Sequence, residues 1–365
     1  PTFSHWKPSA LMPISARLLS WSSLVILLLA SCKKNDNPDP SDTPYEHFQA
    51  SSLPGNAPRA TIVSDPANDR LYFLGGTANS TAISYDYSAR SVLRQRDLGL
   101  YVNSAQACLG AAGGQRELYV GVSKKIYVLD PLTLMTTDSF QVFPDTVAFF
   151  INTIGSNNAN LLFISPVNTF SAEDRGIRSF NRLTRSFVAQ SQGIDNNVVA
   201  YCFQKGNNTA VVSLGNGGNN LPDGISLDLF DAQGNVLSTL SNNQVDNFSA
   251  SNVSFSGNAD FFISGQHVHA LSSLGISASL PKSYIATAID DAGVTIYGLS
   301  DTGVDVISYP SLQITKTLPI PEDLAASITD AASAFHLFFD EGKLLIASSV
   351  VKSGSTVFRI TIFNI

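Results

Sequence analysis

The sequence is poor in charged residues and has no basic cluster. Charged residues make up 14% of its 365 residues, with 22 Lys and Arg against 29 Asp and Glu and a formal net charge of −7. Without a run of basic residues the protein has no surface that could follow a phosphate backbone, so we expect no nucleic-acid partner. A hydrophobic content of 44% is typical of a packed globular chain and excludes a disordered or fibrous protein.

Sequence signatures of common catalytic sites are also absent. The chain contains no Gly-x-Ser-x-Gly elbow, no Walker loop, no His-Glu-x-x-His and no Cys-x-x-Cys. Two of its three cysteines, Cys108 and Cys202, lie in apolar runs that are 94 residues apart. Export would allow this pair to oxidise, but the apolar surroundings favour two buried, unpaired thiols.

An apolar stretch near the N-terminus predicts export. Residues 18–30 read LLSWSSLVILLLA, follow Arg17 and carry no charge. The stretch is shorter than the roughly 20 residues that a membrane-spanning helix needs. It is typical of the hydrophobic region of a signal peptide.

The residues that follow, Leu29-Ala30-Ser31-Cys32, resemble the lipobox of bacterial lipoproteins. The resemblance implies that residues 1–31 form a lipoprotein-type signal peptide and that Cys32 is lipidated. In such lipoproteins the cysteine carries two acyl chains on its side chain and a third on its amino group. Because stable anchoring needs roughly two membrane signals, three acyl chains on Cys32 would attach the protein to a membrane. We therefore expect a cell-envelope protein, anchored in the outer membrane of a Gram-negative bacterium. The alternative is a cleaved secretory signal with an incidental cysteine at this position.

The stretch after Cys32 is predicted to be a flexible tether. Residues 33–46 read KKNDNPDPSDTPYE, with three prolines and no aliphatic residue. Such a composition cannot bury enough surface to fold. We assign residues 32–46 to this tether and residues 47–365 to one folded domain.

The folded domain is predicted to consist of seven repeats. Short apolar runs follow polar or glycine-rich turns, and their starts are 34 to 51 residues apart, with a mean of about 45. The runs begin at Leu71, Leu118, Leu161, Thr209, Asp260, Val294 and Lys343. Apolar and polar residues alternate with a period of two, which indicates strands. Four strands in each repeat predict an all-β, seven-bladed β-propeller of four-stranded blades.

The last repeat ends one strand short, and the N-terminal segment can supply that strand. Residues 47–54 (HFQASSLP) resemble residues 275–281 (GISASLP), which are predicted to form an outer strand. We therefore expect an N-terminal outer strand to close the ring, because this covers an edge that would otherwise recruit other chains. The one helical pattern in the domain lies at 322–334.

One repeat resembles a known family. Residues 118–133 run from LYVGV to IYVLDPLT and resemble the YVTN-type and quinoprotein-like propeller repeat. Trp6 and Trp21 both lie in the predicted signal peptide, so the mature chain has no tryptophan. It therefore lacks the tryptophan of WD repeats, of Asp-box blades and of quinone-cofactor docking motifs.

Few side chains are candidates for catalysis or metal binding. His267 and His269 stand two apart on a predicted strand, so they either form a pair of metal ligands or belong to an exposed blade face. His336 is expected to be a packed histidine of an inner strand. The acid pairs at 290–291 and 340–341 precede glycines in tight turns, where Asp is favoured for backbone reasons. We expect no cofactor at these residues.

Two connections between second and third strands, at 165–176 and 214–224, are about twice as long as their equivalents. Long loops on a rigid scaffold usually carry function. The candidate ligand-binding residues in them are Asn168, Glu173, Asp174, Asn216, Asn219, Asn220 and Asp223. The last four offer oxygen ligands of the kind that calcium takes. They lack EF-hand spacing, however, and loops rich in Gly and Asn are more often simple flexible connections.

Two functions from different classes remain open. The lack of a catalytic signature favours a lipid-anchored binding or scaffold module for a protein or small-molecule ligand. The alternative is a hydrolase or lyase of the lactonase-like propeller group, with acids and a divalent metal in the central channel. The fold cannot separate the two because propellers support both. A stoichiometric divalent ion in the purified protein would favour the enzyme.

Overall fold

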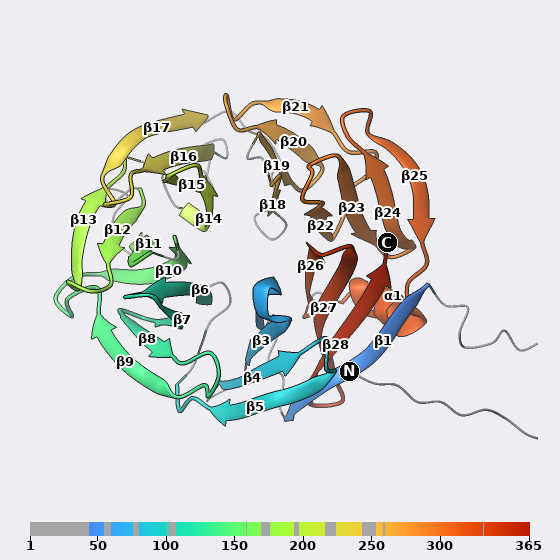
Figure 1. Ribbon diagram of the computed structural model, residues 1–365, viewed down its shortest axis with the longest axis horizontal. Coiled ribbons are helices and arrows are strands. Elements are labelled where there is room, and N and C mark those ends of the chain that lie inside the picture. The colour runs from blue at the N-terminus through green and yellow to red at the C-terminus, as the bar shows by residue number, and fades with distance from the viewer. Residues whose placement is uncertain are drawn as a thin grey trace, which may run out of the picture. The chain divides into compact units, whose positions relative to one another are not determined.

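The segments in which apolar and polar residues alternate form strands of seven four-stranded antiparallel sheets. These sheets lie in a ring around a central axis (Figure 1). The structure, a computed structural model, describes residues 44–54, 60–75, 80–100, 102, 107–157, 159–168, 176–192, 197–215, 224–242, 253–257, 260–330 and 332–365. Within these ranges the chain is an all-β, seven-bladed β-propeller, as the repeat pattern predicts.

Each of blades 1–6 takes its four strands in chain order, from the central axis to the rim. Blades 1 and 2 consist of β2 (Thr61–Asp65), β3 (Arg70–Gly75), β4 (Thr81–Asp86), β5 (Ser91–Asp97), β6 (Ala107–Ala112), β7 (Gln115–Val122), β8 (Lys125–Leu129) and β9 (Thr136–Gln141). Blades 3 and 4 consist of β10 (Phe149–Ser156), β11 (Leu161–Asn168), β12 (Arg178–Asn181), β13 (Ser186–Gln190), β14 (Asn197–Lys205), β15 (Asn208–Gly215), β16 (Gly224–Phe230) and β17 (Val236–Asn242). Blades 5 and 6 consist of β18 (Val253–Phe255), β19 (Phe261–Ser264), β20 (His267–Ala270), β21 (Ile276–Ser279), β22 (Ala286–Ile289), β23 (Thr295–Ser300), β24 (Gly303–Ser308) and β25 (Gln313–Leu318). A 3-10 turn, η2 (Pro66–Asn68), joins β2 to β3.

The N-terminal strand completes blade 7, as predicted. β26 (Ala334–Asp340), β27 (Lys343–Lys352) and β28 (Ser355–Asn364) form its first three strands, and β1 (Tyr45–Pro54) pairs antiparallel with β28 at the rim. Ala50 and Leu53 of β1 are buried, and the ring of Phe48 stacks on Tyr85 of blade 1 at 6.2 Å. β1 therefore closes blade 7 and also packs against the first blade. It begins at Tyr45, within the stretch assigned to the tether.

Neighbouring blades pack through their apolar faces. Successive side chains of a strand point to opposite faces of its sheet, so each blade presents one face to each neighbour. Tyr72 and Leu74 of β3, for example, form one buried cluster with Leu118 and Val120 of β7. The ring is therefore held together by sheet-to-sheet packing.

Every outer strand is paired with its neighbour through a β-bulge. A register shift interrupts the pairing of β1, β5, β9, β13, β17, β21 and β25 with the adjacent strand. A bulge twists and bends a strand, which makes its free edge a poorer template for another chain. The rim is thus protected in the same way in all seven blades.

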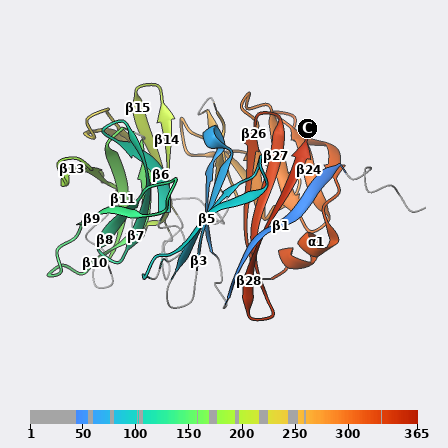
Figure 2. The same ribbon diagram turned by 60° about the horizontal axis from the view of Figure 1, so that its bottom comes forward.

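The connections fall on two faces of the ring. Second-to-third strand connections and outer-to-inner crossings lie on one face, which we call the loop-bearing face; it is at the bottom of Figure 2, with the turn between β27 and β28. Third-to-fourth strand turns lie on the opposite face. There the side chain of Asp130 accepts hydrogen bonds from the backbone N–H groups of Leu132 and Thr133, at 2.9 and 2.7 Å. The residues that resemble the YVTN-type repeat include this turn.

The helical pattern forms one short helix, α1 (Glu322–Ile328), between β25 and β26. It ends earlier than the pattern at 322–334, because Ala334 already belongs to the inner strand β26. Leu324 is buried in the cluster between blades 6 and 7. Asp323 pairs with His47 of β1 at 3.2 Å and with Arg359 of β28 at 2.7 Å, so α1 supports the closing strand (Figure 2).

Candidate functional site

The predicted ligand-binding residues belong to the connections of blades 3 and 4 on the loop-bearing face. Six of them lie outside the described residues: Glu173, Asp174, Asn216, Asn219, Asn220 and Asp223. The lipidation candidate Cys32 also lies outside the described residues. Asn168 is the last residue of β11, and its side chain also lies outside them. The predicted loop bounds need correction, because 165–168, 214–215 and 224 belong to strands that continue the pairing of their blades.

The β10–β11 hairpin extends beyond its blade at the start of the first connection. β11 pairs with β10 as far as Asn168, whereas β12 pairs with β11 only as far as Ile164. No described strand pairs with residues 165–168 on the other side, and the side chain of Val167 is 40% exposed. The hairpin therefore presents a short sheet edge and an apolar side chain beside the connection at 169–175.

Aromatic rings surround the guanidinium of Arg178 at the first residue of β12. The guanidinium carbon lies 4.7 Å from the ring centroid of Phe149, 5.4 Å from that of Phe143 and 5.6 Å from that of Phe187. Phe143 is buried and Phe187 is 40% exposed, so the cluster runs from the seam between blades 2 and 3 to the surface. Such contacts fix the guanidinium and the rings against one another.

This cluster was missed from the sequence because its members lie on segments that are far apart in the chain. The crossing from β9 to β10 carries Phe143, whereas Arg178 and Phe187 belong to blade 3. The available signal was the concentration of phenylalanine at 140–150 and 180–187.

Lys124 orders the same crossing. Its ammonium group donates hydrogen bonds to the backbone carbonyls of Asp145 at 2.9 Å and of Val147 at 2.5 Å. It also lies 5.5 Å from the ring centroid of Phe150. At the loop-bearing end of blades 2 and 3, the cationic groups of Lys124 and Arg178 thus lie against aromatic rings.

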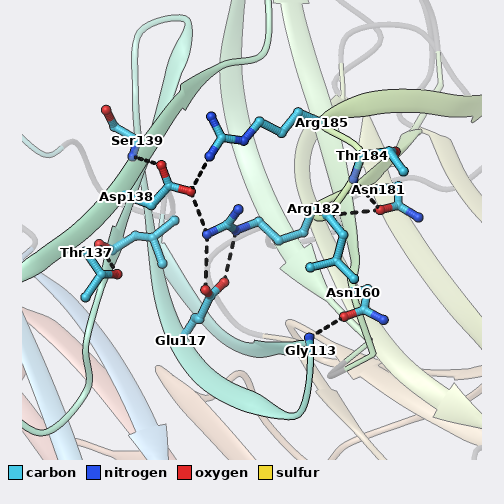
Figure 3. A network of polar contacts seen from close by, with 12 residues as sticks. Gly113, Glu117, Thr137, Asp138, Ser139, Asn160, Asn181, Arg182, Thr184 and Arg185 are labelled. Carbon is cyan, nitrogen blue, oxygen red and sulfur yellow. Dashed lines mark hydrogen bonds and ion pairs between the residues drawn. The ribbon is translucent and has the colours of Figure 1, made fainter.

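A polar network ties blades 2 and 3 together in the same seam, nearer to the face opposite the loop-bearing face (Figure 3). Arg182 donates two hydrogen bonds to Glu117, at 3.0 and 3.1 Å, and pairs with Asp138 at 2.9 Å. Arg185 also pairs with Asp138, at 2.8 Å. The Arg182 side chain is only 9% exposed, so its pairing with two carboxylates makes this a structural connection between blades.

The two histidines of β20 are not an exposed pair. His269 is fully buried, and its ring stacks on Phe262 at 4.8 Å, so an exposed blade face is wrong for this residue. The reason is that this face of blade 5 packs against blade 4. Burial lowers the pKa of His269 to about 4, which keeps the ring neutral at physiological pH. His267 lies beside it, with 6.2 Å between ring centroids.

His336 is packed on the inner strand β26, as predicted. Its Nε2 lies 3.1 Å from the hydroxyl of Ser64 on the inner strand of blade 1. Burial lowers the pKa of His336 to about 4. The contact therefore joins the last blade to the first with a neutral histidine.

The acid pairs have structural roles in their described contacts. The carboxylate of Asp290 accepts backbone hydrogen bonds from Val294 and Thr295, at 2.8 and 3.1 Å, which stabilises its turn. Asp340 is buried and accepts a hydrogen bond from the hydroxyl of Tyr87 of blade 1, at 2.7 Å. Asp340 is thus more than a turn residue, since it helps to close the ring.

Blade 6 contains a buried carboxylate that pairs with a partly exposed lysine. Asp305 accepts hydrogen bonds from Thr317 at 2.7 Å and Tyr284 at 2.8 Å, and Lys282 pairs with it at 3.0 Å. Burial opposes ionisation of Asp305, but these hydrogen bonds outweigh it and lower the pKa of the carboxyl group. The ammonium group of Lys282 also donates a hydrogen bond to the hydroxyl of Ser300 at 3.2 Å, so both of these contacts hold the lysine in the cluster.

Cys108 and Cys202 are both free, as predicted. Burial raises the pKa of Cys108 to about 12 and that of Cys202 well above its usual value. Both groups are therefore thiols at physiological pH, in which form they are poor nucleophiles.

Among the described residues, no group of three or more His, Cys, Asp or Glu side chains is placed to hold a metal ion. In the same part of the chain no helix has the length and apolar character needed to cross a membrane.

The chain is thus a seven-bladed β-propeller, a fold that fits a binding or scaffold module. It matches no family model, and no curated protein matches it. The resemblance to YVTN-type repeats therefore rests on residues 118–133 alone.

Proposed function

We propose that this protein is a lipid-anchored binding or scaffold module of the bacterial cell envelope. Its binding surface is the loop-bearing face of blades 3 and 4, with the adjoining part of blade 2. The ligand is a protein or a small molecule held by the connections 169–175 and 216–223. The lipid on Cys32 anchors the module to the outer membrane.

The main support for this binding surface is the β10–β11 hairpin, which extends beyond the rest of blade 3. It presents the exposed Val167 and a short sheet edge where the longer connection of this blade begins. Beside it, the ring of Phe149 fixes Arg178. Arginine and aromatic side chains are enriched where protein interfaces are strongest, so this surface favours a protein partner.

The contacts of the described candidate catalytic groups also support a binding role. Lys282 is paired with Asp305, Asp340 bonds to Tyr87, and Asp290 stabilises its own turn. These groups hold strands and blades together, which is the task of a rigid scaffold.

Shortening the two connections tests the binding surface. We expect that replacing residues 169–175 and 216–223 by four-residue turns leaves the melting temperature nearly unchanged, because the turns of other blades suffice to join such strands. Capture of the partner that co-purifies with the intact protein should be abolished, as measured by quantitative mass spectrometry after mild cross-linking.

The matched control alters the opposite face. Leu132 and Leu183 are 59% and 57% exposed on third-to-fourth strand turns, so the double variant Leu132→Ala/Leu183→Ala changes apolar surface away from the connections. It should capture the partner fully. Undiminished capture by the well-folded shortened variant would contradict the proposed surface.

Cys32→Ala tests the anchor. We expect the variant to remain an uncleaved precursor or to become soluble, because the acyl chains that hold the protein in the membrane can no longer be attached. Phase partitioning in detergent, together with the mass of the mature protein, measures both effects. A variant that partitions and migrates like the parent would show that Cys32 is not lipidated.

A further inference from the structure

The interface between blades 3 and 4 changes character along its length. At the end near the opposite face it is apolar and contains Phe163 of β11, Val211 of β15 and Phe230 of β16 in one buried cluster. Residues two apart on a strand share a face, so the same faces continue with polar side chains toward the loop-bearing end. Ser165 follows Phe163 and Ser213 follows Val211 in this way.

Three further residues complete this polar half. Ser226 and Asp228 precede Phe230 by four and two positions on β16, and Ser226 pairs directly with Ser213. Thr153 of β10 pairs directly with Ser165. We call Thr153, Ser165, Ser213, Ser226 and Asp228 the interface cluster.

Every member of the interface cluster is buried and has a polar atom without a hydrogen-bond partner in the described part of the chain. Thr153 is 2% exposed and the other four residues are 0% exposed. The oxygens without a hydrogen-bond partner are Thr153 Oγ1, Ser165 Oγ, Ser213 Oγ, Ser226 Oγ and Asp228 Oδ2. An unpartnered buried polar group destabilises the folded state, so five at one interface point to a group that satisfies them.

Comparison with blade 6 indicates what kind of group would satisfy the second oxygen of Asp228. Asp305 and Asp228 occupy the same position on the third strand, and each accepts a hydrogen bond of 2.7 Å from a threonine of the outer strand. In blade 6 the second oxygen of Asp305 receives the ammonium group of Lys282. In the described part of the chain no Lys, Arg or His side chain pairs with Asp228.

We propose that the interface cluster binds a dehydrated monovalent cation, Na⁺, in the role that the Lys282 ammonium group has in blade 6. Carboxylate and hydroxyl oxygens are ligands of hard cations. The single carboxylate balances one positive charge, whereas calcium sites use several carboxylates. The ion joins the two blades beneath their connections at the loop-bearing face.

Size and burial agree with a bare ion. The cluster oxygens are closed to water, yet a cation of this size approaches oxygen to about 2.3–2.6 Å, closer than the roughly 2.8 Å of a water molecule.

Thermal unfolding of the full-length protein in NaCl and in choline chloride of equal ionic strength tests the site. We expect a saturable rise of about 2–4 °C in Tm with Na⁺, because the ion binds only the folded state. Asp228→Asn should abolish this rise. The matched control Asp305→Asn, which removes the counterpart in blade 6, should keep it.

Ser213→Ala keeps the test informative if Asp228→Asn does not fold. We expect it to lower Tm in NaCl, where it removes a ligand, and to raise Tm in choline chloride, where it removes an unpartnered buried hydroxyl. An equal rise in both salts would overturn the proposal, as would a Tm of the parent that does not depend on the cation. A response to CaCl₂ at concentrations far below those of Na⁺ would overturn the monovalent assignment.

Discussion

Deletion of β1 is expected to lower the free energy of unfolding by roughly 5 kcal/mol, a large share of the usual 5–15 kcal/mol. A variant lacking residues 1–54 loses the buried side chains of Ala50 and Leu53 and the contact of Phe48 with Tyr85. It also exposes the whole edge of β28, so aggregation should accompany unfolding. Denaturant unfolding followed by circular dichroism measures the loss.

A variant that lacks only residues 1–43 is the control for this deletion. It keeps all of β1, including the ring contact of Tyr45 with Phe363 at 5.6 Å, and should unfold like the parent. A peptide of residues 44–54 added to the longer deletion should restore stability, whereas the same peptide with Leu53→Asp should not. Equal stability of the two deletions would show that β1 does not support the ring.

Gly155→Ala is expected to destabilise the protein by about 3 kcal/mol. Overpacking typically costs 1–3 kcal/mol, and here the obstacle is the side chain of Cys202, which the neighbouring inner strand holds in place. A Cβ at Gly155 of β10 would lie 2.0 Å from Sγ and 2.9 Å from Cβ of Cys202 on β14. Neither blade can move away freely, since each also packs against its other neighbour. The midpoint of denaturant unfolding measures the effect.

A double-mutant cycle assigns this loss to the contact. Cys202→Ala removes the closer of the two atoms, so Gly155→Ala/Cys202→Ala should be more stable than the sum of the single variants predicts, by about 1–2 kcal/mol. Gly275→Ala is the control, since its nearest neighbour would lie 3.4 Å away, and it should change stability by less than about 0.5 kcal/mol. Strict additivity at 155 and 202 would contradict the steric explanation.

The strands and their repeat could be predicted because they depend on local sequence. Apolar runs such as those beginning at Leu71 and Leu161 belong to the second strands of blades 1 and 3. The likeness of residues 47–54 to another outer strand also predicted β1 correctly, since a strand carries its own pattern of buried and exposed positions.

The candidate site was less accessible to such reasoning. Loop length indicated where function should lie, but it set the boundaries wrongly, because Ser165 and Val167 continue a strand whose partner β10 is equally long. The predicted role of Asp340 as a turn residue was also incomplete. A turn pattern does not reveal its hydrogen bond with Tyr87, which is 253 residues away in the chain.

The sequence by itself determined the class of fold, the number of blades and the closing strand, because period-two alternation and turn residues act within a few positions of one another. Only the tertiary structure decided which polar groups meet between blades. It pairs Arg182 with Glu117 across one seam, and it gives Asp305 a lysine while leaving one oxygen of Asp228 without a partner. These outcomes depend on which faces of two sheets come together when the ring closes, and the pattern along one strand carries no record of the residues opposite it.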